Sequence, residues 1–184
     1  MQQLDLAIQL GDQVLARVHP APRTGDLLAA DFAVPPARHA VAPLRRADLV
    51  HGLVLLSTLP NIHKHACTAQ IIELEEHVPV ALPAARIVHV SADHAHHWAE
   101  VDLYHANVAA PGYSLCCADD ASREAFGRAF GVAVEGHRRV AHGLFALKEG
   151  VFIAADIPFD QMEPPDVAAF LLRTKRLLGC TSSS

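Results

Sequence analysis

The residues best suited to chemistry lie together in the segment His63-Lys64-His65-Ala66-Cys67. A thiolate is both a nucleophile and a metal ligand, and neighbouring cations lower the pKa of a thiol from its free value of about 8.5. The segment lies between a predicted strand and a predicted helix, so unpaired N–H groups at the helix N-terminus also favour the thiolate. We therefore predict a reactive thiolate at Cys67. The alternative is that Cys67 only continues the apolar stripe of this helix.

The same segment also carries the ligand types of a metal site. His63-x-His65-x-Cys67 offers two imidazoles and a thiolate, and His142 on a later strand is a candidate fourth ligand. This nitrogen and sulfur set suits Zn or Cu. The cluster His94 to His97 is a second metal candidate, because His94 and His97 are three residues apart and share a helix face. A solvated helix start is the alternative for that cluster.

Composition excludes several classes of protein. The chain has 184 residues, 13 of them histidine, with 51% hydrophobic residues and a formal net charge of -5. Its apolar runs are far shorter than the ~20 residues of a membrane span. No stretch gathers the Lys and Arg needed to neutralise a phosphate backbone. We expect a soluble globular domain over residues 1–179 and a loose tail over 180–184, with neither nucleic acid nor membrane as a partner.

Cysteine usage and the N-terminus suggest a compartment. The four cysteines are unevenly spaced and form no CxxC pair, which is atypical of a disulfide scaffold. The first residues show no basic region followed by an apolar stretch, as a secretory signal would. We expect a cytoplasmic protein with reduced cysteines.

The hydrophobic pattern predicts alternating strands and helices. The expected elements are, in order, a hairpin around Gly11-Asp12, strands at 31–34 and 40–41, a short helix at 44–49, a strand at 52–57, a helix at 66–77 stopped by Pro79, a strand at 86–90, a helix from Ser91 or Asp93 to Tyr104, a strand at 113–117, a helix capped by Asp119 or Asp120 and ended by Gly131, strands at 140–147 and 151–155, and a last helix from Pro164-Pro165 to Gly179. This order predicts an α/β sheet covered by helices, thioredoxin-like as first choice and flavodoxin-like as second. Chemistry gathers where the parallel strands of such sheets end, and Cys67 lies there.

On these residues and elements the chain resembles the thiol peroxidases of the atypical two-cysteine peroxiredoxin class. The similarity extends over nearly the whole chain, from the N-terminal hairpin through the loop before Cys67 to the strand ending in Ser91-Ala92-Asp93, the helix with Phe126 and the closing hairpin. The resemblance implies a thioredoxin-like fold, a homodimer and Cys67 as peroxidatic nucleophile. It also implies a peroxide substrate and an external thiol reductant such as thioredoxin.

The chain departs from the family pattern at the partners of the cysteine. The family loop reads approximately Pro-Ser-x-Asp-Thr-x-Val-Cys, and here His63-Lys64 replaces the Asp-Thr pair. The family's active-site arginine aligns with His142. The resemblance thus implies reduction of hydrogen peroxide or alkyl hydroperoxides by a Cys67 thiolate, with Lys64 and His142 as altered partners and weakened activity.

The resolving thiol of the family also has no counterpart. It is expected near Asp102, but no cysteine occurs between Ala92 and Leu115. On a strand, Cys116 and Cys117 would point in opposite directions, so at most one faces the site, and we expect both to pack in the core. Two further hypotheses stay open: a degenerate redoxin that binds Zn or Cu through His63, His65, Cys67 and His142, and a non-enzymatic protein that binds a partner.

Overall fold

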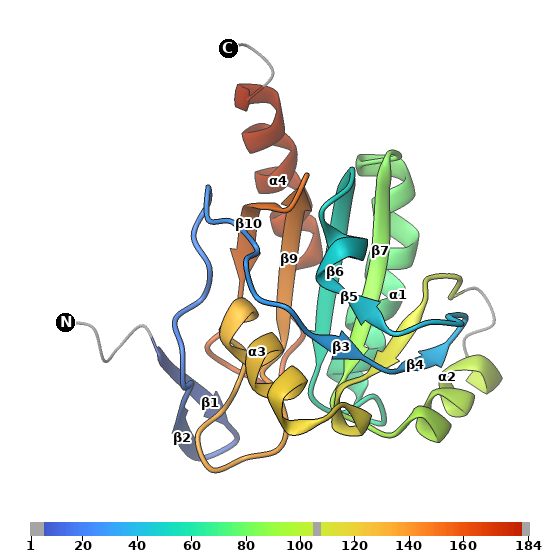
Figure 1. Cartoon of the computed structure of the whole chain (residues 1–184), viewed down its shortest axis with the longest axis vertical. Helices are drawn as coiled ribbons and strands as arrows, with labels where there is room; N and C mark the ends of the chain where they lie inside the picture. Colours follow the sequence, from blue (N-terminus) through green and yellow to red (C-terminus); the bar gives the residue numbers. More distant parts are fainter. Residues whose placement is uncertain (1–5, 105–107, 182–184) are drawn as a thin grey trace.

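The computed structural model describes residues 6–104 and 108–181, with the backbone alone for 102–104 and for 180 and 181. Its centre is a six-stranded mixed sheet with the order β10-β9-β6-β7-β8-β4 (Figure 1). The strands of this sheet are β4 (Pro36–Arg38), β6 (Leu53–Leu59), β7 (Ala85–Ser91), β8 (Gly112–Ser114), β9 (Gly143–Lys148) and β10 (Val151–Asp156). β6, β7 and β8 run parallel, whereas β9, β10 and β4 are antiparallel to their neighbours. The predicted α/β sheet with a closing antiparallel hairpin is confirmed.

Two smaller pairs of strands lie outside this sheet. β1 (Ala7–Leu10) and β2 (Gln13–Ala16) form the predicted N-terminal hairpin, and β3 (Ala33–Val34) pairs with β5 (Leu44–Arg45). Gly11 has a φ of 59°, the left-handed conformation that a tight turn between β1 and β2 needs. The hairpin projects beside the end of the sheet at which β6 and β7 terminate (Figure 1).

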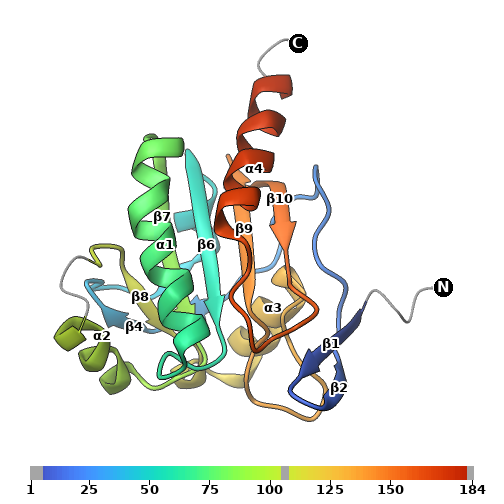
Figure 2. The same cartoon turned by 180° about the vertical axis from the view of Figure 1, so that it is seen from behind.

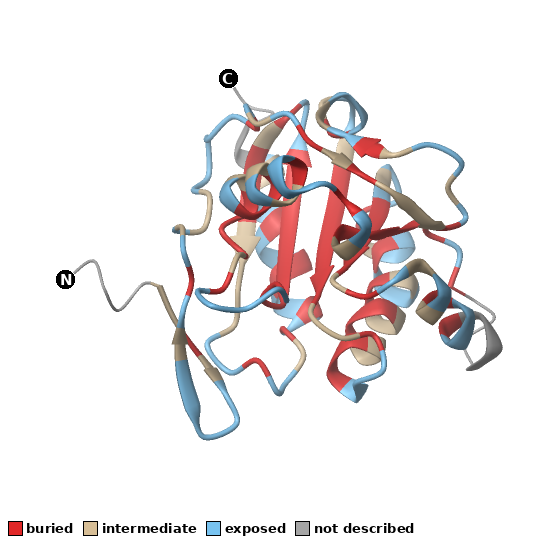
Figure 3. Cartoon of the chain, turned by 60° about the horizontal axis from the view of Figure 1, so that its bottom comes forward, coloured by how far each residue is buried: buried red, intermediate tan, exposed pale blue. Residues whose placement is uncertain are grey.

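Helices cover both faces of the sheet. α1 (His65–Ala81) and α4 (Val167–Thr181) lie on one face (Figure 2), and α3 (Asp120–Phe130) lies on the other. α2 (Trp98–Tyr104) lies near the β8 and β4 edge, and the 3-10 turns are η2 (Arg46–Leu49), η3 (Ala95–His97) and η4 (Leu115–Cys117). The central strands are therefore buried on both faces (Figure 3), which explains their continuous apolar sequence.

Each face of the sheet has its own core. The rings of Phe126 and Phe130 in α3 are tilted against each other, and Phe130 packs edge-on against Phe145 and Phe152 of the sheet. The opposite core packs residues of α1 and α4 against the same strands. Among the described residues, no helix combines the length and the apolar content needed to cross a bilayer.

Several predicted boundaries are wrong. α1 continues through Pro79 in its last turn: Pro79 forfeits one intrahelical hydrogen bond, the helix ends two residues later, and the Leu82 N–H still bonds the Val78 carbonyl. α4 continues past Gly179, which does not adopt the left-handed conformation that makes Gly131 end α3 with a φ of 65°.

The segment before α2 and the early strands also differ from the prediction. No side chain caps η3, because the Asp93 carboxylate instead accepts a hydrogen bond from the Ile62 N–H at 2.8 Å. The predicted helix at 44–49 divides into β5 and η2, and β4 replaces the strand expected at 40–41. Asp119 does cap α3, by accepting from the Ser122 N–H at 2.7 Å.

Candidate active site at Cys67

The end of β6 and the start of α1 position Cys67. β6 ends at Leu59, and after a short loop the helix begins at His65, so Cys67 lies in the first helical turn as predicted. No part of Cys67 is exposed (0%), and the Asn61 N–H donates a hydrogen bond to its sulfur at 3.3 Å. The loop before the helix therefore supplies a donor to the sulfur.

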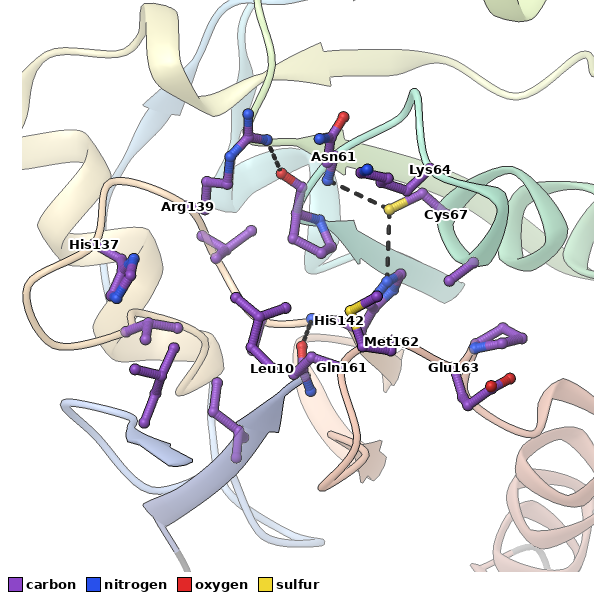
Figure 4. A pocket seen from close by; sticks show the side chains of 18 of the residues that line it. Leu10, Asn61, Lys64, Cys67, His137, Arg139, His142, Gln161, Met162 and Glu163 are labelled. Carbon is purple, nitrogen blue, oxygen red and sulfur yellow. Dashed lines mark hydrogen bonds between the residues drawn. The ribbon is translucent and has the colours of Figure 1, made fainter. Parts of the chain in front are cut away.

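A buried imidazole faces the sulfur from the other side. His142, just before β9, places Nε2 3.6 Å from Cys67 Sγ (Figure 4). Its Nδ1 lies 2.7 Å from Oε1 of Gln70, one helical turn after Cys67 in α1. The Gln70 amide nitrogen donates to the carbonyls of Thr58 and Gly143, at 3.4 and 3.2 Å. The amide oxygen is thus the atom that faces His142.

This amide orientation fixes the tautomer of His142. An amide oxygen only accepts, so Nδ1 must carry the proton and Nε2 is left as an acceptor. The Cys67 thiol then donates to Nε2, in a chain from thiol to imidazole to amide. A nucleophile, a base and a group that orients the base are the three parts of an activated nucleophile.

The electrostatics favour the neutral form of both groups. Burial raises the pKa of Cys67 to about 12, and it outweighs the Asn61 hydrogen bond and the positive charge of Arg139, which lower it; the Asp93 carboxylate raises it further. Burial also lowers the pKa of His142 to about 4. Burial thus favours a thiol at Cys67 in the resting protein, where a thiolate was expected, because desolvation is stronger than the Asn61 hydrogen bond and the charge of Arg139.

Cys67 lies in the wall of a pocket of about 450 Å³ (Figure 4). The pocket is lined mainly by apolar side chains from the N-terminal hairpin, the segment before β9 and the segment after β10, among them Ile8, Leu10, Leu15, Val134, Val140 and Met162. Lys64, His65, His137 and Arg139 add polar groups to its rim. The pocket can hold an apolar molecule with a polar end at the sulfur.

Asp93 and Arg139 tie the loops around this pocket together. The Asp93 carboxylate is 4% exposed and lies 3.2 Å from the Arg139 guanidinium, besides accepting from Ile62 and Ser91. Arg139 also donates to the Pro60 carbonyl. The segment that carries His142 is thereby joined to the loop that carries Asn61.

Comparison with solved structures identifies this architecture. The structure of a thiol peroxidase from Chromobacterium violaceum superposes with a TM-score of 0.76 at 15% identity, over 97% of this chain and 99% of that one. A peroxiredoxin-like protein from Aquifex aeolicus gives 0.72 at 17% identity, over 94% and 97%. The peroxidoxin BcpB from Mycobacterium tuberculosis gives 0.62 at 21% identity, over 84% and 96%.

This chain has the peroxiredoxin fold. The predicted thioredoxin-like architecture is thereby confirmed, although neither a family model nor a curated protein matches the sequence. At these identities the likeness establishes the fold alone. The chemistry of this peroxiredoxin-like chain has to be argued from its own residues.

The structure brings only part of the predicted site together. His142 contacts the Cys67 sulfur, whereas the exposed Lys64 side chain lines the pocket and makes no hydrogen bond or ion pair with a described residue. His63 turns away and places Nδ1 2.8 Å from the Glu100 carboxylate. Within residues 6–104 and 108–181, no three of His63, His65, Cys67 and His142 gather as ligands of one ion.

The predicted placement of Cys116 and Cys117 on a strand, packed in the core, is wrong. β8 ends at Ser114, and Leu115 to Cys117 form the 3-10 turn η4 instead of continuing the strand. Successive side chains in such a turn are about 120° apart instead of pointing to opposite faces. The two sulfurs consequently lie 3.8 Å from each other at the surface, and Cys117 is exposed instead of packing in the core.

Gln70 and Arg139 are the residues of the site that sequence reasoning missed. Gln70 lies on the buried side of α1, between Cys67 and Ile71. A polar amide among the apolar residues of that helix face was the sequence feature that could have pointed to it. A buried polar group needs partners, and those of Gln70 come from β6 and β9. Arg139 lies three residues before His142, and no motif in the sequence marks it as part of a site.

Proposed function

We propose that this chain is a slow thiol peroxidase in which Cys67 reduces an organic hydroperoxide and His142 acts as its base. The contact of 3.6 Å between Cys67 Sγ and His142 Nε2, at the wall of an apolar pocket in a peroxiredoxin fold, supports it most strongly. Gln70 supports the same role by leaving Nε2 free to accept the thiol proton.

The proposed step transfers one oxygen atom to sulfur. The sulfur attacks the terminal oxygen of ROOH while its proton passes to His142 Nε2. The O–O bond breaks, and the leaving alkoxide takes the proton from the imidazolium to give ROH. Cys67 is oxidised to the sulfenic acid and the peroxide is reduced to the alcohol.

We infer that an external reductant returns Cys67 to the thiol. The sulfurs of Cys116 and Cys117 contact each other, Ser114 and His94, and among the described side chains no contact links either sulfur to Cys67. Cys180 is another candidate resolving thiol, and its side chain lies outside the described residues. One external thiol RSH condenses with the sulfenic acid to a mixed disulfide and water, and a second releases Cys67 as RSSR. We infer a thioredoxin-like reductant, and a homodimer as the assembly.

Two features make the proposed reaction slow. The resting cysteine is a thiol with a pKa of about 12, so each turnover must first move its proton. The sulfur is also fully covered, so a peroxide in the pocket must displace its neighbours before contact. The apolar lining favours hydroperoxides with an organic chain over hydrogen peroxide.

Single-turnover oxidation of Cys67 tests this function. The second-order rate constant with an alkyl hydroperoxide should exceed that with hydrogen peroxide, and His142→Ala should lower it by about 100-fold. Added imidazole should restore part of the rate in that variant, which a merely structural role of His142 does not predict. His77→Ala, an exposed position of α1 that does not line the pocket, is the matched control and should leave the rate unchanged. Equal rates in the His142 and His77 variants would refute the role of His142.

A further inference from the structure

A second cluster of sulfur and nitrogen atoms lies outside the Cys67 site. One imidazole nitrogen of His94 and the sulfurs of Cys116 and Cys117 all lie within 4.8 Å of one another. The two sulfurs are 3.8 Å apart, and the imidazole nitrogen is 3.5 Å from the sulfur of Cys117. The proposed peroxidase step uses none of these groups.

The sheet topology explains why these groups meet. β7 and β8 run parallel with Ser91 beside Ser114, so both strands end at the same edge. The segment after β7 presents His94, and η4, directly after β8, presents the two cysteines. The Ser114 hydroxyl donates to the Asp93 carbonyl and joins the two segments next to the cluster. The ends of β7 and β8 therefore bring the three ligand residues together.

Two of the three ligand separations match those around a tetrahedral zinc ion. With Zn–S near 2.3 Å and Zn–N near 2.05 Å, tetrahedral angles place two sulfurs about 3.8 Å apart and a sulfur and a nitrogen about 3.5 Å apart. The two sulfurs are 3.8 Å apart, and His94 Nδ1 is 3.5 Å from Cys117 Sγ. The third pair, His94 with Cys116, lies within 4.8 Å and has to close further to bind an ion.

Neighbouring groups hold the ligands in place. The buried Ser114 hydroxyl contacts the sulfurs of Cys116 and Cys117 at 3.4 and 3.2 Å, and Arg123 donates to the Cys116 carbonyl at 3.2 Å. Such outer partners orient the ligands of metal sites. His94 and Cys117 are exposed, so an ion can reach the cluster from solvent.

We propose that His94, Cys116 and Cys117 form a zinc site with its fourth position open to solvent. Zinc displaces the protons of both thiols, which pass to the buffer, and is held by two thiolates and Nδ1 of His94. Two thiolates and an imidazole are soft and borderline ligands, which select zinc over magnesium or calcium. Three protein ligands with an open position leave the ion accessible to an external ligand.

Zinc titration of the full-length chain tests this site. Protein reduced and stripped with a chelator is titrated with Zn²⁺ in competition with a chromophoric chelator, and we expect one equivalent to bind. Cys116→Ser/Cys117→Ser and His94→Gln should abolish binding, and Ser114→Ala should weaken it by about tenfold. Cys67→Ser and His63→Ala/His65→Ala are the matched controls and should bind like the wild type.

Cobalt supplies an independent readout of the ligands. Co²⁺ in place of zinc should give thiolate-to-metal charge-transfer absorption in the wild type and in Cys67→Ser, and none in Cys116→Ser/Cys117→Ser. Circular dichroism of the metal-free variants checks that the surface substitutions leave the fold intact. The proposal is overturned if the wild type binds no zinc, if Cys67→Ser removes binding, or if the pair only forms a disulfide under the titration conditions.

Discussion

The protonation state of Cys67 is the property of the site that is most sensitive to its surroundings. With its pKa at about 12, about one Cys67 in 100,000 is a thiolate at pH 7. A free cysteine with a pKa near 8.5 is about 3% thiolate at the same pH. Because only the thiolate is alkylated, Cys67 should react with iodoacetamide about 3,000-fold more slowly than free cysteine on protonation alone, and burial of the sulfur slows it further.

The pH dependence separates protonation from burial. Poor access lowers the alkylation rate by the same factor at every pH, whereas a pKa of about 12 makes the rate rise about tenfold per pH unit well beyond pH 9. Peptide mass spectrometry follows Cys67 separately from the exposed Cys117, and protein unfolded in urea gives the reference rate. A rate that levels off below pH 9 would refute the raised pKa of Cys67, because it would show that the helix N-terminus and Arg139 outweigh burial.

Three further predictions concern the groups around this pair. Asp93→Asn should lower the pKa of Cys67 and Arg139→Gln should raise it, measured by the same alkylation profile, because the carboxylate raises this pKa and the guanidinium lowers it. Gln70→Met should lower the free energy of unfolding by about 2 kcal/mol in urea denaturation, since it removes the hydrogen bond at His142 Nδ1 and two buried bonds to the carbonyls of Thr58 and Gly143. His142 should make the fold sensitive to acid, because its pKa is about 4 in the folded chain and near 6.5 in the unfolded chain. The unfolded chain therefore binds the proton first as the pH falls. About 3 kcal/mol of the unfolding free energy present above pH 6.5 is then lost by pH 4. Urea denaturation at pH 7 and 4 should show this loss in the wild type and a smaller one in His142→Leu.

The architecture follows from patterns that are local in sequence. Continuous apolar runs predict the central strands β6 and β7, and Asp119 with Gly131 marks both ends of α3. The errors occur where tertiary contacts decide. Asp93 carries the sequence signature of a helix cap, but its carboxylate instead bonds the Ile62 N–H of a loop 31 residues away.

The chemistry of the site was harder to predict than its location. The position of Cys67 after a strand end was predictable, but its pKa depends on burial in the folded chain, where His142, 75 residues further along, lies against the sulfur. The pairing of Cys116 with Cys117 depends on a change from strand to 3-10 turn after Ser114, and residue alternation gives no sign of it. His142 was predicted from the resemblance, whereas the amide that orients it was not.

Trapping the first oxidation product shows whether Cys67 is the residue that reduces the peroxide. Reduced protein is mixed with one equivalent of an alkyl hydroperoxide in the presence of dimedone, which captures sulfenic acids, and each cysteine is followed by peptide mass spectrometry. We expect the dimedone adduct on Cys67 in the wild type, a strongly reduced yield in His142→Ala and partial recovery when imidazole is added. An unmodified Cys67, or an adduct confined to Cys116 and Cys117, would contradict this role of Cys67.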